Sequence, residues 1–418
     1  MRIHTAVFTA IMVLFVSGAR SQTDIYLKAE RSGRGRIPVV VDDFEADPGQ
    51  PDQVARYVNA VLDRDLILSG LFETLRFEER SDTLPEGKTA AAVVEGALWK
   101  NEDKYMLEAR LLDFSSREVI FRKRYNFRRD ARRSVAHHLC DEIAFFLVGE
   151  RGIATTRILF CRSEGGVKSL FMIDYDGFGE RRFTENELVV SPLWLDENRF
   201  CFTSFRRENP DCYIVDLKQG KRSFLSHRKG INIAGSYFGE QDRIAITLSV
   251  KGNSEIYLID SNGEIVKRLT RNRAIECSPS WSPGGRELAF VSDRTGAPQV
   301  YIMDEFGGSV RRLTRSGSYN TSPAWSPAGD MITYVSRDGW LYRLKLISPD
   351  GLVEENLFDD YLSYEDPCWA PDGRHIAATV RYGGEPWIVI VNIDTGEKRR
   401  LIQGESSSWS PLPTAEPD

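Results

Sequence analysis

Few side chains in this 418-residue sequence have the types and spacing that catalysis requires. His137 and His138 are adjacent in a predicted helix, so their rings point to different faces and suit neither a shared metal ion nor a proton relay. The Gly-x-Ser-x-Gly turn that presents the nucleophile of many hydrolases does not occur in the sequence. We therefore expect polar surface positions for His137, His138, His227 and His375, and no catalytic residue, metal site or cofactor.

Six cysteines are present, but no two form a Cys-x-x-Cys pair and no histidine lies at metal-ligand spacing from one. Aligned copies of the repeat described below have small apolar residues where Cys201, Cys212 and Cys368 stand, which predicts buried apolar positions. Cys201 and Cys212 face each other across one predicted hairpin. A disulfide between them in an oxidising compartment is an open alternative.

Aspartate recurs at fixed places in a repeated pattern, as at Asp260, Asp293, Asp304 and Asp372. Each stands in a short turn-rich segment, where aspartate side chains hydrogen-bond the local backbone. Paired carboxylates for glycoside hydrolysis would have to converge on one point, and the sequence gives no sign of that. The pattern predicts turns. A cation in a central channel is an open alternative, although no calcium-loop spacing supports it.

The repeated pattern consists of a short strand with an aromatic residue, a Ser-Pro-x-Gly turn and three further strands. Its sharpest copy, residues 278–314, contains all four strands. The aromatic residue returns every 40 to 44 residues, at Trp194, Tyr237, Trp281, Trp325, Trp369 and Trp409. A four-stranded unit with a period of about 40–50 residues is typical of β-propeller blades.

The two ends of the repeat region complete each other. Residues 157–184 hold three predicted strands with no aromatic strand before them, and residues 407–411 hold a lone innermost strand. Pairing of this last strand with the first three would close the ring and remove its exposed sheet edges. The sequence therefore predicts a six-bladed propeller, residues 154–418, closed by its last strand.

Residues 22–153 have a different pattern. Apolar residues at helical spacing predict two amphipathic helices, one ending near Leu68 and one at Gly149 or Gly152. Between them lies a predicted antiparallel meander of three strands, 91–99, 105–113 and 119–127. The fold class is therefore mainly β, with a smaller two-helix α+β domain ahead of the propeller.

The first residues have the features of an export signal. Arg2 precedes an almost entirely apolar run, Ala6–Val16, and small residues follow up to a cleavage site after Ala19 or Ser21. A helix that spans a bilayer takes about 20 residues, so a short membrane anchor is the weaker alternative. We predict a signal peptide at 1–21 and an exported mature protein.

The balance of charge is acidic. The net charge is −6, and loss of residues 1–21 with their two arginines makes it −8. Such a protein is a poor candidate for binding nucleic acid or anionic lipid. Residues 117–133 oppose this balance with eight basic residues. We interpret them as the solvated face of a strand and a helix start, with a docking patch for an acidic partner as the alternative.

The stretch that leads into the propeller carries the most specific signal. Residues 132–158 resemble the TolB family in Ala136, His137, Asp141, Gly149, Gly152, Thr156, Arg157 and Ile158. They depart from the family at Val148, where threonine is usual, and at Ala154, where phenylalanine is usual. Asp65-Leu66 and Ser69-Gly70-Leu71-Phe72 resemble a second family motif, and the likeness covers nearly all of the mature chain.

Resemblance to the TolB family implies a periplasmic adaptor of the Tol–Pal system, without catalysis and monomeric on its own, that maintains outer-membrane integrity and constriction during cell division. It implies that loops before the innermost propeller strands dock the peptidoglycan-associated lipoprotein Pal, and that the N-terminal segment contacts TolA. In this sequence the loop residues are Asn232, Ala234, Glu276, Cys277, Asn320, Thr321, Glu365 and Asp366. The segment residues are Gln22, Thr23, Asp24, Ile25, Tyr26, Leu27 and Lys28.

Two rival interpretations are open. A secreted propeller hydrolase, or an accessory subunit of a peptidase, would need a nucleophile that the sequence does not offer. A generic TolB-like repeat protein that binds another ligand is equally consistent with the blades, but it leaves the preceding α+β domain without a role.

Overall fold

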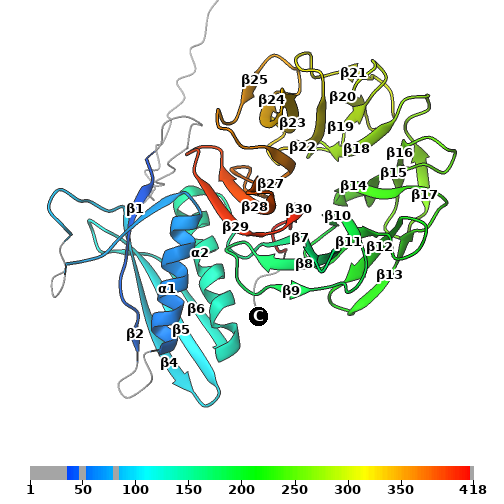
Figure 1. Ribbon diagram of the computed structural model, residues 1–418. Coiled ribbons are helices and arrows are strands. Elements are labelled where there is room, and N and C mark those ends of the chain that lie inside the picture. The colour runs from blue at the N-terminus through cyan, green and yellow to red at the C-terminus, as the bar shows by residue number, and fades with distance from the viewer. Residues whose placement is uncertain (1–34, 47–52, 79–83, 415–418) are drawn as a thin grey trace, which may run out of the picture.

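The computed structural model describes residues 35–46, 53–78 and 84–414. The predicted signal peptide, 1–21, and the predicted TolA-binding segment, 22–28, lie outside these residues. Figure 1 shows two parts: a sheet with two helices, and a ring of six small sheets.

The first part is a mixed sheet with both helices beside it (Figure 1). Its strands are β1 (Ile37–Val41), β2 (Glu45–Ala46), β3 (Phe72–Leu75), β4 (Ala92–Asn101), β5 (Lys104–Asp113) and β6 (Val119–Arg128). They lie in the order β3-β1-β4-β5-β6, with β2 beside β4. The antiparallel pairing of β4 with β5 and of β5 with β6 confirms the predicted meander.

The helices are α1 (Gln53–Leu68) and α2 (Arg132–Val148), and a 3-10 turn, η1 (Arg129–Ala131), leads into α2. Buried residues of α1 recur every fourth position, as at Val54, Val58 and Leu62, so one face packs into the core. Helix α2 ends at Gly149, which has a left-handed backbone with φ 80° and donates its N–H to the carbonyl of Phe145 over 2.8 Å. Glycine suits this capping position because it lacks a Cβ.

The second part is a propeller of six four-stranded antiparallel sheets. The strands of its first half are β7 (Arg157–Glu164), β8 (Val167–Asp174), β9 (Arg181–Arg182), β10 (Val189–Trp194), β11 (Arg199–Ser204), β12 (Asp211–Asp216), β13 (Lys221–Ser226), β14 (Asn232–Phe238), β15 (Arg243–Leu248), β16 (Glu255–Ile259) and β17 (Ile265–Arg268), with a 3-10 turn, η2 (Gly239–Gln241), before β15. Those of its second half are β18 (Glu276–Trp281), β19 (Glu287–Ser292), β20 (Gln299–Asp304), β21 (Arg311–Arg312), β22 (Asn320–Trp325), β23 (Ile332–Asp338), β24 (Leu341–Ile347), β25 (Glu354–Asn356), β26 (Tyr364–Trp369), β27 (His375–Tyr382), β28 (Glu385–Asn392), β29 (Lys398–Gln403) and β30 (Glu405–Trp409).

The ring closes as the sequence predicts. The last strand, β30, pairs antiparallel with β7, so that one sheet has the order β30-β7-β8-β9. Trp409 lies opposite Ile158 in this pairing. The other five blades are each built from four consecutive strands. The prediction of six blades closed by the last strand is confirmed.

Each innermost strand bulges at the same place, just before its aromatic residue. Non-glycine residues with positive φ occupy this bulge in five strands: Ser191, Ser278, Ser322, Asp366 and Ser406. Serines just before the aromatic residue then form hydrogen bonds with the next blade. Ser236 Oγ accepts the backbone N–H of Trp281 over 3.0 Å, and Ser280 Oγ accepts that of Trp325 over 3.0 Å. The repeat is thus a scaffold that links neighbouring blades.

Three of the four recurrent aspartates, Asp260, Asp304 and Asp372, bond the backbone of their own turns, as predicted. The fourth, Asp293, accepts the N–H of Ile275, which is 18 residues away. Asp304 accepts the N–H groups of Phe306 and Gly308 over 2.9 and 2.7 Å. Asp260 makes the equivalent pair of bonds in its own turn, over 3.0 and 2.8 Å. These contacts satisfy backbone donors that the turns would otherwise leave to solvent.

The prediction of surface positions was wrong for two histidines. His137 is 5% exposed and His375 is 3% exposed. An aspartate oxygen lies 2.6 Å from Nδ1 of each ring, that of Asp65 for His137 and that of Asp372 for His375. Pairing of this nitrogen lowers the cost of burying the imidazole.

The six cysteines are free thiols in the structure. Cys201 and Cys212 are fully buried, in agreement with the predicted apolar positions, whereas Cys368 is half-buried. Burial raises the pKa of the Cys368 thiol to about 11, so this group is protonated at neutral pH and is a weak nucleophile.

The two parts of the fold share one hydrophobic core. A single cluster contains Val39 and Leu62 from the sheet and helix, Leu139 from α2, and Phe160 and Ile390 from the blades. The predicted boundary between residues 153 and 154 falls within this cluster, and we retain it as a proposal about the organisation of the chain. Among the described residues, no helix is long and apolar enough to cross a membrane.

We predict that Ser280→Ala destabilises the propeller. The substitution removes the acceptor of the Trp325 N–H, and an unpaired buried donor costs roughly 1–3 kcal/mol. Urea unfolding measures the change, with Ser318→Ala in an exposed loop as the control. Equal unfolding free energies for the two variants would contradict the proposed link between blades.

Candidate functional site

The propeller presents two different faces. The strands of each blade are counted from the innermost, the first, to the outermost, the fourth. One face contains the connections between the second and third strands and those from a fourth strand to the first strand of the next blade; we call it the loop face. The opposite face contains the remaining connections, among them residues 175–180, 370–374 and 393–397, and we call it the turn face. The predicted Pal-binding residues belong to the loop face or to the strand starts beneath it.

The structure places those eight residues at different depths. Four are buried: Asn232, Ala234, Glu276 and Asn320. Three are half-buried, Cys277, Thr321 and Glu365, and Asp366 is exposed. The buried four do not present their side chains on the surface of this chain, so a partner that docks here has to contact the loops above them.

The buried polar residues at the strand starts hold these loops in place. Glu276 accepts hydrogen bonds from Asn272, Ser292 and Arg294 over 2.8, 3.0 and 2.9 Å. Burial raises the pKa of the Glu276 carboxyl, although these bonds oppose the shift. Asn320 plays a similar part in the next blade, where it donates to Gln299 over 2.7 Å. Their role is therefore to preorganise the loop face.

The side chains that the loop face does expose were not predicted from the sequence. Large apolar residues stand out from six of its loops: Leu188, Phe205, Val250, Ile275, Trp340 and Tyr361. Trp340 is 92% exposed and Tyr361 is 91% exposed. Apolar residues exposed one by one are ordinary on a protein surface, and the turn face exposes Phe306 and Leu352 as well. The candidate contacts on the loop face are therefore the two aromatic rings that are almost fully exposed. The signal in the sequence was an aromatic residue at the tip of a short acidic loop, Asp338-Gly-Trp and Asp359-Asp-Tyr.

The same face carries exposed charges of both signs. Its exposed basic residues are Arg206, Arg207, Lys229, Lys251, Arg271, Arg273, Arg315, Arg337 and Arg381. Exposed acidic residues lie in early loops, at Glu185 and Glu208, and in later ones, at Asp338, Asp359 and Asp366. A partner on this face would therefore meet both basic and acidic groups beside the apolar ones.

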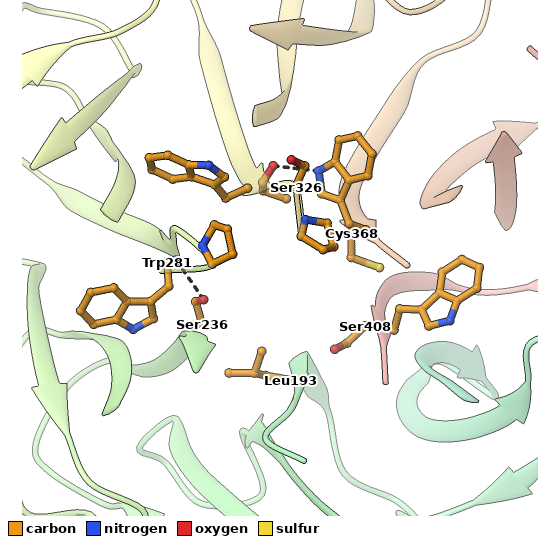
Figure 2. A pocket seen from close by; sticks show the side chains of 12 residues that line it. Leu193, Ser236, Trp281, Ser326, Cys368 and Ser408 are labelled. Carbon is orange, nitrogen blue, oxygen red and sulfur yellow. Dashed lines mark hydrogen bonds between the residues drawn. The ribbon is translucent and has the colours of Figure 1, made fainter. Parts of the chain in front are cut away.

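A cavity of about 250 Å³ lies on the propeller axis. Figure 2 shows Leu193, Ser236, Cys368 and Ser408 around the opening, each from a different blade. Its lining residues are small polar, proline, aromatic and aliphatic ones, with no histidine or carboxylate among them. The cavity therefore lacks the acid and base that hydrolysis requires.

The N-terminal part is joined to the propeller through the turn face. Arg133 of α2 forms an ion pair with Asp176 in the β8–β9 turn, and Arg374 pairs with Glu150 over 2.6 Å. The two parts pack closely at Gly70, where any side chain would collide with the propeller: a Cβ there would lie 2.3 Å from Asn392 Nδ2. Gly70 also has a left-handed backbone with φ +71°, which favours glycine. These contacts leave the loop face uncovered by the described residues of this chain.

The family-like residues of the sequence gather at this joint. His137 bonds Asp65 over 2.6 Å, and the Tyr175 hydroxyl donates to the other oxygen of Asp65 over 2.7 Å. Asp141 accepts the Ala154 N–H over 2.7 Å and both the N–H and the hydroxyl of Thr155. The motif residues thus fix the N-terminal part to the first blade.

Comparison with known proteins agrees with this architecture. A model of the TolB beta propeller domain family matches residues 146–413, which is more than half of the chain. The chain belongs to the TolB beta-propeller family. The match covers all six blades, including the closing strand β30.

Curated relatives carry the name Tol-Pal system protein TolB. That of Nitrosomonas europaea is 31% identical over 237 residues, 54% of this chain and 55% of the relative. That of Desulfosudis oleivorans is 32% identical over 260 residues, 57% and 58% of the two chains. The chain thus spans about half the length of the curated relatives it matches.

Solved structures extend the likeness to the N-terminal part. TolB from Acinetobacter baumannii superposes with a TM-score of 0.77 at 25% identity, covering 91% of this chain and 98% of that one. A nidogen/laminin complex shares the propeller fold alone, with a TM-score of 0.50 at 10% identity over 61% of this chain and 98% of that one.

We predict that Asp141 stabilises the fold more at pH 5 than at pH 7. Burial raises the pKa of Asp141 to about 6, above its value of about 3.9 in an unfolded chain. The folded state therefore binds a proton on Asp141 more tightly than the unfolded state does. The stability gained from this proton is full below about pH 4 and is lost as the pH rises through 6.

Urea unfolding of the wild type and of Asp141→Asn at pH 5 and pH 7 measures this effect. We expect the wild type to lose roughly 1 kcal/mol relative to the variant between the two pH values. Parallel stability profiles for the two proteins would contradict the raised pKa.

Proposed function

We propose that this protein is a non-catalytic periplasmic adaptor of the Tol–Pal system. In this proposal the loop face of the propeller binds the lipoprotein Pal, and the N-terminal segment around residues 22–31 binds TolA. The adaptor then connects the two partners and supports outer-membrane integrity and constriction during cell division. The name shared by the curated relatives supports the assignment to this system.

The observation that carries the proposal is the exposed apolar set on the loop face. Trp340 and Tyr361 are more than nine-tenths exposed. The loop of Tyr361 is held by Asp360, which accepts hydrogen bonds from the Leu362 N–H and the Tyr364 hydroxyl. The Gly339 carbonyl beside Trp340 accepts one from Arg337, so both rings stand on hydrogen-bonded loops. A rigid surface loses little conformational entropy on binding, which favours affinity. Aromatic side chains also supply much of the energy at protein interfaces. The N-terminal part occupies the turn face around Asp176 and Arg374, so this region is already covered.

A role without catalysis accords with the chemistry of the described residues. The axial cavity has no lining histidine or carboxylate, and burial raises the pKa of its Cys368 thiol. His137 and His375 are each held by an aspartate in the interior. These groups support the adaptor over the rival hydrolase.

We predict that Trp340→Ala and Tyr361→Ala each weaken binding of Pal by roughly tenfold or more, because truncation of an interface aromatic commonly costs about 1–3 kcal/mol. Isothermal titration of the mature chain with the soluble domain of Pal measures the affinity. Phe306→Ala and Leu352→Ala are matched controls, since both residues are well exposed but lie on the turn face.

The pattern of the four variants decides between the interpretations. Losses confined to the loop-face pair support the proposal, and losses confined to the turn-face pair would overturn the assignment of the face. Absence of Pal binding by the wild type would favour the generic repeat protein that binds another ligand.

We also predict that deletion of residues 22–31 abolishes binding of TolA and leaves the propeller folded. A short segment can bind by ordering on its partner or by extending a sheet edge. The Pal affinity of the deleted and intact chains, each with and without TolA, tests whether the two sites are coupled. Identical Pal affinities in all four conditions would refute coupling of the two sites. Retained TolA binding by the deleted chain would refute the proposal that residues 22–31 bind TolA.

A further inference from the structure

A compact group of potential metal ligands lies in the joint between α2 and the β8–β9 turn. A ring nitrogen of His137 and carboxylate oxygens of Asp174 and Asp176 lie within 4.8 Å of one another. His137 and Asp176 are 5% and 2% exposed, and Asp174 is half-buried. The three residues come from the two different parts of the fold.

The hydrogen bonds of His137 leave one ring nitrogen, Nε2, without a partner among the described residues. Its Nδ1 lies 2.6 Å from Asp65, whose oxygens also accept the Tyr175 hydroxyl, so Nδ1 carries the proton and donates it. Its Nε2 is buried and has no hydrogen-bond partner in the structure. A histidine oriented by a carboxylate behind it, with a free lone pair in front, is the usual arrangement of a metal-ligating imidazole.

The carboxylate of Asp174 makes different contacts from the equivalent aspartates of other blades. Asp174 occupies the turn position of Asp260 and Asp304, whose carboxylates each bond two N–H groups of their own turn. The backbone of the β8–β9 turn is the same, with Gly177 N–H on the Asp174 carbonyl as Gly307 N–H is on that of Asp304. Among the hydrogen bonds of the described residues, no turn N–H reaches the Asp174 carboxylate. Its oxygens are directed toward Arg133 and His137 instead.

Arg133 is the cation that now neutralises this group. It pairs with Asp176 and lies 3.8 Å from Asp174 through Nε. It also has other partners, the Tyr57 hydroxyl at 3.5 Å and the Phe178 ring at 4.1 Å. The guanidinium can therefore release Asp176 to another cation without losing every favourable contact.

We propose that His137, Asp174 and Asp176 bind a divalent cation of the Zn²⁺ class, which ties the N-terminal part to the propeller. One imidazole nitrogen and two carboxylates match the ligand types of zinc, with a water as the fourth ligand. Bond lengths of about 2.0–2.2 Å place tetrahedral ligand atoms roughly 3.4 Å apart. The three ligand atoms lie within 4.8 Å of one another, so side-chain rotation can bring them to these positions. The cation and Arg133 then compete for Asp176. This proposal does not depend on the binding of Pal or TolA.

The test is titration of the mature, chelator-treated chain with Co²⁺ alone, followed by displacement with Zn²⁺. We expect one equivalent of Co²⁺ to bind, with visible bands of a low-coordinate site that Zn²⁺ abolishes. Asp174→Asn should weaken binding by roughly tenfold or more. This variant alters a half-buried group and is expected to fold, which circular dichroism checks; His137→Gln is the second variant.

Two further variants make the outcome specific. His138→Gln changes the neighbouring histidine of the same helix and should bind as the wild type does. Arg133→Gln removes the competing cation and should bind several-fold more tightly, an effect that a purely structural role for the cluster would not produce. Equal binding by the wild type and Asp174→Asn, weaker binding by Arg133→Gln, or no binding up to millimolar Co²⁺ would each overturn the proposal.

Discussion

The pairing of β30 with β7 is the constraint on which the rest of this structure depends. It joins residues about 250 positions apart, so that Trp409 lies opposite Ile158. Without it the ring would end in two exposed sheet edges, and the first blade would lack its innermost strand. Because closure fixes all six blades around one axis, it also fixes the loops between them. The loop face is therefore a property of the whole ring and of no single blade.

Closure has a second consequence at the opposite face. The blade that contains β30 and β7 also carries the β8–β9 turn, where Tyr175 and Asp176 meet α1 and α2. The N-terminal part is thus attached to the blade at which the ring is sealed. This arrangement leaves the loop face uncovered by the described residues, so it is free to bind a partner.

The fold was largely predictable because its signals are local. The Trp-Ser-Pro turns and the turn aspartates act within a few residues of themselves, so they could be recognised without knowledge of the fold. The surface could not be predicted in the same way. Glu276 and Asn320 are polar residues at strand starts, and their burial follows from side chains 16 to 21 residues away. His137 looked like a surface residue because its partner, Asp65, is 72 residues away.

The central proposal is that Pal binds to the loop face, with Trp340 and Tyr361 in the contact. Hydrogen–deuterium exchange of the mature chain, measured with and without Pal, tests it most directly because every loop is followed at once. We predict slower exchange in residues 269–275, 338–341 and 357–363, with no change in the turns at 305–308 and 349–353. Protection confined to those turns, or to the N-terminal part, would contradict the claim.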